Sequence, residues 1–395
     1  MSWAEQSGPS FANNAPELDL DKLLIQVNEI GGSDLHLTAG APPTIRIRGE
    51  MTPVEGRATL TPRELQEGLY AVMTERQRQV LEDTRELDFA YAVPGYARFR
   101  VNVFWQRESL GAVMRLIPWE IKPLAELGMP PVVESFARLK RGLVLVTGPT
   151  GSGKSTTLAS VLDLVNRTRR GHIMTIEDPI EFLHSHRGCL VNQREVGADT
   201  HDFRNALKHV LRQDPDVILV GELRDLDTIS VALTAAETGH LVLATLHTQS
   251  AQDTISRVVD VFPANQQQQV RTQLAATLQG VVCQTLVPTV DGKGRVPAAE
   301  IMVCNSGIRA MIRDDKLPQI PGALQSGARQ GMQTLDAHLA AHVRAGLITR
   351  EMGLEHCATR DDFLTLVGSA ASLPPGTAHA GQRPATAPGA TQGWS

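Results

Sequence analysis

The segment GPTGSGKS at residues 148–155 has the spacing of a phosphate-binding loop, GxxxxGK[ST]. An apolar run of strand length precedes it, and a segment with helical spacing follows it. Glycines let backbone N–H groups turn inward around an anion, and the start of a helix adds the positive end of its dipole. In such a loop Lys154 contacts the β- and γ-phosphates and the Ser155 hydroxyl binds Mg²⁺. The residues predicted to hold the nucleotide are Gly148, Pro149, Thr150, Gly151, Ser152, Gly153, Lys154, Ser155 and Thr156.

Acidic residues stand at the ends of two further apolar strands. Hydrolysis needs a metal ligand and a base that orients water, and in an open parallel sheet such groups come from the carboxyl ends of neighbouring strands. The segment TIEDPIE supplies Glu177, Asp178 and Glu181, and VILVGE supplies Glu222. Gly221 stands where many P-loop enzymes carry aspartate, so we expect Glu222 to act on Mg²⁺ through water. Solvated strand ends are the alternative interpretation of these acids.

Two histidines flank a third apolar strand in the segment TGHLVLATLHT. His240 precedes the strand and His247 follows it. Considered alone, each histidine is better explained by an ordinary structural role.

The elements that must position these residues follow two different patterns. From Gly142 onward, short apolar strands alternate with amphipathic helices, which is typical of a parallel sheet covered by helices. Strands are expected over residues 143–147, 172–177, 217–220 and 241–246. Beyond Pro263 the chain is expected to be mainly helical, over residues 266–286, 306–314, 332–344 and 350–357.

The earlier part of the chain predicts a small mixed α+β module. Helices are expected over residues 18–29 and 61–84, the second with Thr61 as N-cap and Pro62 at its first position. Strands are expected over 34–37, 44–48, 87–93, 98–104 and 111–116. The resulting division is a flexible arm at 1–16, an N-terminal domain at 17–117, a proline-rich linker at 118–131, a nucleotide-binding domain with C-terminal helices at 132–369 and a disordered tail at 370–395.

Composition excludes several classes of protein. The 395 residues include 43 acidic and 38 basic ones, and the net charge of −5 argues against non-specific nucleic-acid binding. The four cysteines form no CxxC pair, which argues against a disulfide scaffold and a cysteine zinc site and fits a reducing compartment. No apolar run approaches the ~20 residues of a membrane helix, and no basic and apolar leader opens the chain. We therefore expect a soluble, cytoplasmic protein.

Four motifs together resemble those of the secretion and type IV pilus ATPases, a family of P-loop NTPases. GPTGSGKSTT resembles its Walker A motif, TIEDPIEF its Asp box, LRQDPDVILVGELRD its Walker B motif and TAAETGHLVLATLHT its His box, in the family's order and spacing. Between residues 17 and 365, the stretches SDLHLTAGAPPTIRIRG, CLVNQREVG, RVVDVFPA and GMQTLD are similar to the pilus-retraction members. The segment GIRAMIRD at 307–314 resembles their retraction motif AIRNLIRE but differs at its first, fourth, fifth and last positions.

This resemblance implies a PAS-like N-terminal domain and a RecA-like ATPase domain, assembled as a ring-shaped homohexamer. The implied function is hydrolysis of ATP with Mg²⁺ to power pilus retraction, the disassembly that drives twitching motility. The implied partners are an inner-membrane platform protein at the pilus base and a paralogous retraction ATPase, with no nucleic acid. The implied location is the cytoplasmic face of the cell membrane at the pilus base.

The resemblance also assigns roles to individual residues. It makes Glu181 the general base and Glu222 the Walker B acid on the Mg²⁺ side, and it makes His240 and His247 the residues that couple nucleotide state to domain position. Three basic residues of the N-terminal strands match positions that bring positive charge to the γ-phosphate when the domain closes, and such arginines stabilise transition-state charge. They are Arg98, Arg100 and Arg115. An exposed strand face with alternating arginines explains any one of them nearly as well.

Other functions remain open from the sequence. Within the family, the alternatives are an assembly ATPase, a type II secretion ATPase and an accessory retraction paralogue. The first two usually carry extra N-terminal domains and often a four-cysteine zinc insertion, which this sequence lacks. A nucleic-acid translocase is disfavoured by the net charge and by only three tyrosines with no aromatic–basic stripe. A non-catalytic nucleotide sensor is disfavoured because the phosphate-loop residues and both key acids are present.

Replacing Lys154 with alanine is expected to abolish ATP turnover without unfolding the chain, because the change deletes a charge that faces the phosphates but no core contact. Phosphate release measures the turnover, and far-UV circular dichroism measures the fold. Turnover at the wild-type rate in this variant would contradict the phosphate-loop assignment.

Overall fold

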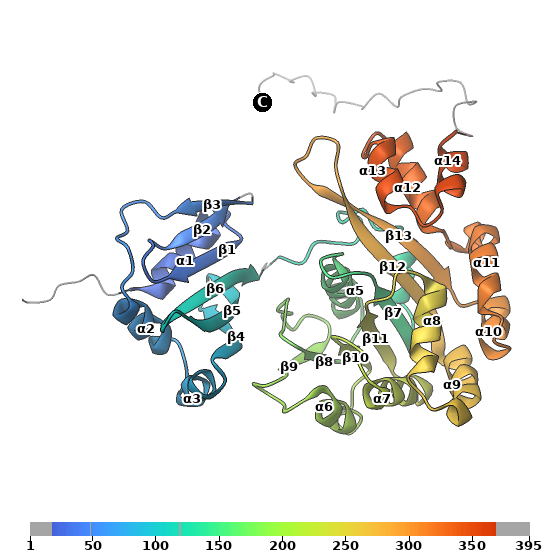
Figure 1. The fold of residues 1–395 in the computed structure, drawn as a ribbon. Coiled ribbons are helices and arrows are strands. Elements are labelled where there is room, and N and C mark those ends of the chain that lie inside the picture. Colours follow the sequence, from blue (N-terminus) through green and yellow to red (C-terminus); the bar gives the residue numbers. More distant parts are fainter. Residues whose placement is uncertain (1–17, 48, 118–119, 369–395) are drawn as a thin grey trace, which may run out of the picture.

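The computed structural model describes residues 18–47, 49–117 and 120–368 (Figure 1). The predicted arm at 1–16 and the predicted tail at 370–395 lie outside the described residues. The described elements form two modules, each built on its own sheet. We call them the N-terminal module, from α1 to β6, and the C-terminal module, from α4 to α14. The predicted domain limits stay predictions.

The N-terminal module is an antiparallel sheet with strand order β3-β2-β1-β6-β5-β4. Its apolar face packs under the helices, and Leu23, Leu35 and Phe99 are fully buried there. Five of its strands were predicted, and β3 was not. The elements are α1 (Leu20–Glu29), β1 (Asp34–Thr38), β2 (Thr44–Ile47), β3 (Glu50–Pro53), α2 (Pro62–Ala71), α3 (Glu75–Thr84), β4 (Glu86–Val93), β5 (Ala97–Gln106) and β6 (Ser109–Ile117).

The single helix predicted over 61–84 is wrong, because the chain forms α2 and α3 in its place. Thr61 caps α2 as predicted, and the Glu64 carboxylate accepts a hydrogen bond from the N–H of Thr61. Thr74 caps α3 in the same way, together with Gln77. Each Thr-x-x-Glu/Gln box satisfies two N–H groups at a helix start. The second box therefore starts a new helix where apolar spacing alone indicates a continuous one.

The C-terminal module is a seven-stranded sheet with the order β13-β12-β7-β11-β10-β8-β9. Its pairs are parallel except β12 with β13. The four predicted strands are confirmed as β7, β8, β10 and β11. The strands are β7 (Gly142–Thr147), β8 (His172–Glu177), β9 (Leu190–Glu195), β10 (Val217–Val220), β11 (Leu241–Leu246), β12 (Leu278–Pro288) and β13 (Arg295–Val303).

Helices cover both faces of this sheet (Figure 1). Alternate residues of one strand serve opposite cores, so Leu145 packs into one hydrophobic cluster and Val144 and Val146 into the other. The helices are α4 (Val132–Phe136), α5 (Lys154–Thr168), α6 (Phe203–Val210), α7 (Leu226–Glu237), α8 (Ala251–Asp260), α9 (Ala264–Thr277), α10 (Ser306–Arg313), α11 (Ile320–Ser326), α12 (Leu335–Arg344), α13 (Arg350–His356) and α14 (Arg360–Gly368).

The helix predicted over 266–286 is wrong in its second half. Helix α9 ends at Thr277, and β12 begins at Leu278, pairs with β7 and turns into β13. The segment LQGVVCQTLVP is mainly apolar, and a short apolar run does not distinguish a buried helix from a buried strand by periodicity. Pairing on both sides of β12 decides the outcome. The predicted helices over 306–314 and 350–357 are confirmed within one residue.

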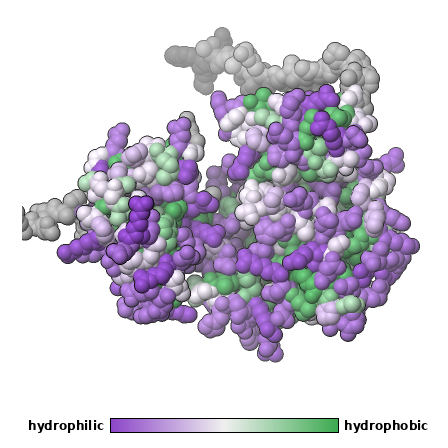
Figure 2. All heavy atoms as spheres, in the orientation of Figure 1, coloured by the Kyte–Doolittle hydropathy of each residue, from purple (hydrophilic) through white to green (hydrophobic). Residues whose placement is uncertain are grey.

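The segment predicted as a linker packs against the C-terminal module within its described part. Leu124 and Met129 are 3% and 5% exposed and belong to the same hydrophobic cluster as α4 and α5. No helix among the described residues is long and apolar enough to cross a membrane. Hydrophilic side chains cover most of the face in Figure 2, and hydrophobic ones gather only in small patches.

Candidate active site

The phosphate loop joins β7 to α5, as the sequence predicts. Gly148, Gly151 and Gly153 have φ values of 141°, 79° and 87°, a region that side chains with a Cβ rarely adopt. At Gly148 space is limiting as well, since a Cβ there would lie 2.1 Å from the backbone oxygen of Gln284. The loop geometry therefore depends on glycine at these positions.

The start of α5 is free for an anion. Its N-cap is Gly153, and no side chain caps the helix. The first N–H groups of a helix have no partner within the helix, and together with the dipole they bind phosphate oxygens. A glycine cradle that leads into an uncapped helix start is the arrangement that a nucleotide phosphate chain requires.

Lys154 lies in the loop with only 9% of its surface exposed. Its Nζ donates hydrogen bonds to the carbonyl oxygens of Gly148 at 2.8 Å and Pro149 at 3.0 Å. Burial lowers the pKa of Lys154, and the carboxylates of Glu222 and Glu181 act in the opposite direction. The fold thus brings the predicted base and the predicted Walker B acid into the electrostatic environment of this one lysine.

Glu222 joins the site from the end of β10. Its carboxylate lies 2.9 Å from Arg224 Nε and 3.2 Å from His247 Nε2. His247 follows β11, the strand that lies between β10 and the phosphate-loop strand β7. The second histidine of the predicted pair therefore lies at the site and contacts a predicted catalytic acid.

The Asp-box acids divide by burial. Glu177 ends β8 and is half-buried, and its carboxyl accepts hydrogen bonds from Thr175 Oγ1 at 2.6 Å, from Gln193 Nε2 at 3.1 Å and from the N–H of Glu181. Burial raises the pKa of Glu177. Glu181 and Asp178 are exposed. Glu177 thus anchors the loop, while the side chain of Glu181 is open to solvent.

The structure does not bring His240 to the site. His240 precedes β11, and its carbonyl accepts from Gly142 N at the amino end of β7. Its ring Nδ1 lies 3.0 Å from the carbonyl oxygen of Ala235. The intervening strand places it roughly 20 Å from His247, at ~3.3 Å per residue. The predicted coupling role of His240 stays a prediction. Any such role would act from the amino ends of the strands, opposite the phosphate loop.

The three arginines predicted to reach the γ-phosphate do not lie at the phosphate loop. Two of them pair with carboxylates elsewhere, and the third is exposed. Arg98 Nη2 donates to Glu195 Oε2 at 2.6 Å, and Arg115 Nε donates to Asp34 Oδ1 at 2.7 Å. Arg100 is exposed and lies opposite Arg115 in the β5–β6 register. The structure does not gather these arginines at the phosphate loop, and their predicted role requires movement of the N-terminal module.

Gln284 is a residue of the site that the sequence reasoning missed. It lies on β12, is 3% exposed and donates from Nε2 to the carbonyl oxygen of Ser152 in the loop at 2.6 Å. Its Oε1 and the Ser152 hydroxyl are buried without a partner among the described residues. Nothing in the sequence indicates this role, because the segment that contains Gln284 is predicted to be helical. Gln284 lies under the loop only because β12 pairs with β7.

The oxygen atoms near the phosphate loop fit Mg²⁺ as nucleotide-hydrolysing enzymes bind it. Among the described residues no group of three or more histidine, cysteine or acidic side chains could hold a metal. Mg²⁺ in such enzymes uses one or two protein oxygens with water and substrate phosphates. Ser155 in the first turn of α5 and the carboxylate of Glu222 offer those oxygens.

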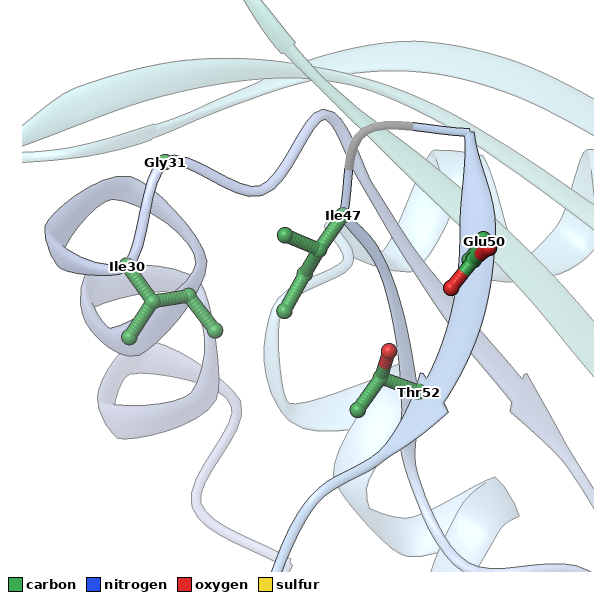
Figure 3. A pocket seen from close by; sticks show the side chains of 5 residues that line it. All are labelled: Ile30, Gly31, Ile47, Glu50 and Thr52. Atoms are coloured by element: carbon green, nitrogen blue, oxygen red, sulfur yellow. The ribbon is translucent and has the colours of Figure 1, made fainter.

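A hollow on the N-terminal module is separate from this site (Figure 3). It lies between the end of α1 and strands β2 and β3, and its lining contains none of the predicted site residues. The lining residues are Ile30, Gly31, Ile47, Glu50 and Thr52.

Comparison with known proteins places the chain in a family. Residues 86–361 match the family model described as type II/IV secretion system protein. The chain belongs to this family. Its sequence is 51% identical over 346 residues to the type IV pilus retractation ATPase PilT of Pseudomonas aeruginosa, covering 88% of this chain and 100% of that protein. It is 42% identical over 350 residues to the type IV pilus ATPase PilU of the same organism, covering 89% and 91%.

Solved structures support the same assignment. A crystal structure of the pilus retraction motor PilT with bound ADP matches with a TM-score of 0.83 and 48% identity, covering 88% of this chain and 99% of that one. The ATPase DotB of Legionella pneumophila matches with a TM-score of 0.74 and 28% identity, covering 85% and 93%. The predicted α/β P-loop fold and the resemblance to pilus-retraction ATPases are confirmed. The PAS-like description of the N-terminal module stays a prediction.

Glu181→Gln and Glu222→Gln are each expected to slow ATP hydrolysis at least about 100-fold, the range of a lost general base or metal-side group. Nucleotide binding should largely survive, because each acid acts on water or metal more than on the base and ribose. Phosphate release and binding of a fluorescent ATP analogue measure the two effects. Normal hydrolysis by Glu181→Gln would move the base to Glu177, which Glu177→Gln then tests.

Proposed function

We propose that this chain is a motor ATPase that hydrolyses ATP to power the retraction of type IV pili. The observation that carries the proposal is the likeness to PilT of Pseudomonas aeruginosa, which extends over the whole of that protein. The geometry agrees with it, because the phosphate loop, two acids and His247 meet at one edge of the sheet.

In the proposed reaction the loop and the start of α5 bind the phosphates of ATP. Lys154 exchanges its two carbonyl partners for phosphate oxygens, and Glu181 orients the attacking water and takes its proton. Ser155 and Glu222 would hold Mg²⁺, Glu222 through water, and the ion would supply positive charge that neutralises the phosphates. His247 contacts Glu222 and follows β11, so it passes changes at the nucleotide site to that strand.

The two modules give the reaction a mechanical output. The phosphate loop and the acids belong to the C-terminal module, whereas the three arginines belong to β5 and β6 of the N-terminal module. Closure of one module on the other brings arginine charge to the γ-phosphate, and product release reopens it. In a cyclic homohexamer, staggered closure displaces a partner held at the pore. We propose that this partner is the inner-membrane platform protein at the pilus base, and that the chain lies on the cytoplasmic face of that membrane.

An accessory retraction motor is the second candidate, and the match to PilU over nearly all of both chains favours it over other family functions. Such a motor would act beside a paralogous retraction ATPase. The two candidates differ in what the chain does when it is the sole retraction motor in the cell.

Deletion of the gene for this chain is expected to leave cells with extended pili that do not retract, as seen by fluorescence imaging of labelled pili. Wild-type protein should restore retraction, and the Lys154→Ala variant should not. If deletion instead prevents pilus extension, the proposed retraction role is wrong and the chain is an assembly ATPase. Normal retraction after deletion, lost only when a paralogue is also deleted, would assign the accessory role. Purified protein whose ATPase rate rises on addition of DNA would indicate a translocase instead.

Ring assembly has its own test. ATPase activity should rise faster than linearly with protein concentration until the hexamer forms. Lys154→Ala subunits mixed into wild type should lower activity by more than their mole fraction, because neighbouring subunits share each cycle. Light scattering measures the assembly in the same samples. A fully active monomer would contradict the shared cycle.

A further inference from the structure

Side chains of β9 hold the loop that carries the proposed base. Glu195 Oε2 accepts a hydrogen bond from the N–H of Ile180 at 3.1 Å. Two residues earlier, Gln193 accepts from the N–H of His184 and donates to the carbonyl of Phe182, each at 2.8 Å. Residues two apart on a strand share a face, so one face of β9 holds the backbone of this loop through hydrogen bonds. The base, Glu181, lies between its anchor points.

The same oxygen of Glu195 contacts the other module. Arg98 Nη2, on β5, donates to Glu195 Oε2 at 2.6 Å, and the two side chains are 17% and 8% exposed. A charge-assisted hydrogen bond in so little solvent is short, strong and weakly screened. One carboxylate oxygen therefore joins the N-terminal module to the backbone of the residue next to the base.

Arg98 also offsets negative charge around Glu195. Glu177 is the register partner of Glu195 in the β8–β9 pair, and Asp199 Oδ2 accepts the N–H of Glu195 at 2.9 Å. A buried carboxylate that loses its cation among other acids is unfavourable, and it gains free energy by turning toward water. Such a turn would release the N–H of Ile180.

We propose that Glu195 is a positioning residue that couples docking of the N-terminal module to the orientation of Glu181. While Arg98 binds it, Glu195 holds Ile180 and the loop is ordered. When the N-terminal module moves and takes Arg98 away, the loop loses that anchor. This inference rests on the proposed function in its assignment of Glu181 as the base. It also makes two positions of Arg98 mutually exclusive, since one guanidinium on Glu195 is not at a phosphate.

Hydrogen exchange of the Ile180 amide tests the coupling without reference to activity. In the nucleotide-free full chain, Arg98→Ala is expected to speed this exchange about fivefold, the effect of one lost hydrogen bond. Glu195→Gln keeps an acceptor oxygen but loses the ion pair, so it should match Arg98→Ala, and Glu195→Leu should exceed both. The double change Arg98→Ala with Glu195→Leu should add nothing to Glu195→Leu alone.

Arg63→Ala is the matched control, because Arg63 forms an exposed pair with Glu67 in the same module. It should leave the Ile180 exchange unchanged. Arg98→Lys, which keeps a cation, should recover part of the protection. Wild-type exchange in Arg98→Ala, with the fold intact by circular dichroism, would overturn the inference.

ATP turnover supplies the second readout. Glu195→Gln is expected to lower kcat about tenfold, as misplacement of a catalytic group does, while KM and nucleotide affinity stay within about twofold. Faster exchange at Ile180 with an unchanged kcat would overturn the inference, because the coupling would then not reach the base. A wild-type chain that hydrolyses no ATP would contradict the proposed function instead, and the exchange experiment would still decide whether Arg98 and Glu195 hold the loop.

Discussion

The parallel register of β7, β11, β10 and β8 is the constraint on which the rest of the site depends. These four strands pair without a shift, so Leu143, Val242, Ile218 and Met174 stand side by side across the sheet. All four then end at one edge, and the residues that follow them meet there. A shift of one residue in any pair would turn every side chain of that strand to the other face. The nearness of Lys154, Glu222 and Glu181 is thus a product of sheet register.

Each loop at that edge is also held by a neighbouring strand. Gln284 of β12 holds the carbonyl of Ser152, and the backbone of Thr245 on β11 accepts the N–H of Leu223 after β10. Glu195 of β9 holds the N–H of Ile180. A backbone group in a buried loop costs free energy unless it has a partner. The neighbouring strands that supply those partners therefore set the geometry of the catalytic groups without touching substrate.

The N-terminal module contributes charge to this edge through the ion pair of Arg98 with Glu195. Arg98 reaches Glu195, whereas Arg115 is engaged within its own sheet by Asp34, whose pKa this pair helps to lower against the opposing effect of burial. The difference follows from their places on the sheet. Arg98 lies near the start of β5, opposite Ile117 at the end of β6, and the chain leaves the module there for the C-terminal module. Movement of one module would therefore act on the other at this corner of the sheet, where Arg98 contacts Glu195.

The sequence by itself determined the parts of this protein whose physics is local. The spacing of Gly148–Ser155 between a strand and a helix identified the phosphate loop and its strand, and apolar runs bounded by acids or histidines identified three more central strands. Local pattern failed where two local signals competed. The apolar periodicity of 61–84 concealed the capping box at Thr74, and the apolar run after Thr277 concealed β12.

Tertiary structure alone decided which distant groups meet. It placed Gln284 under the phosphate loop and Glu195 behind the Asp box, and it separated His240 from His247 by the length of a strand. It also gave Arg98 a carboxylate partner 97 residues away. Spacing along the chain encodes caps, turns and periodicity, because those depend on neighbours a few residues apart. The choice of a long-range partner depends on sheet order, register and burial, and these are settled only when the whole sheet has assembled.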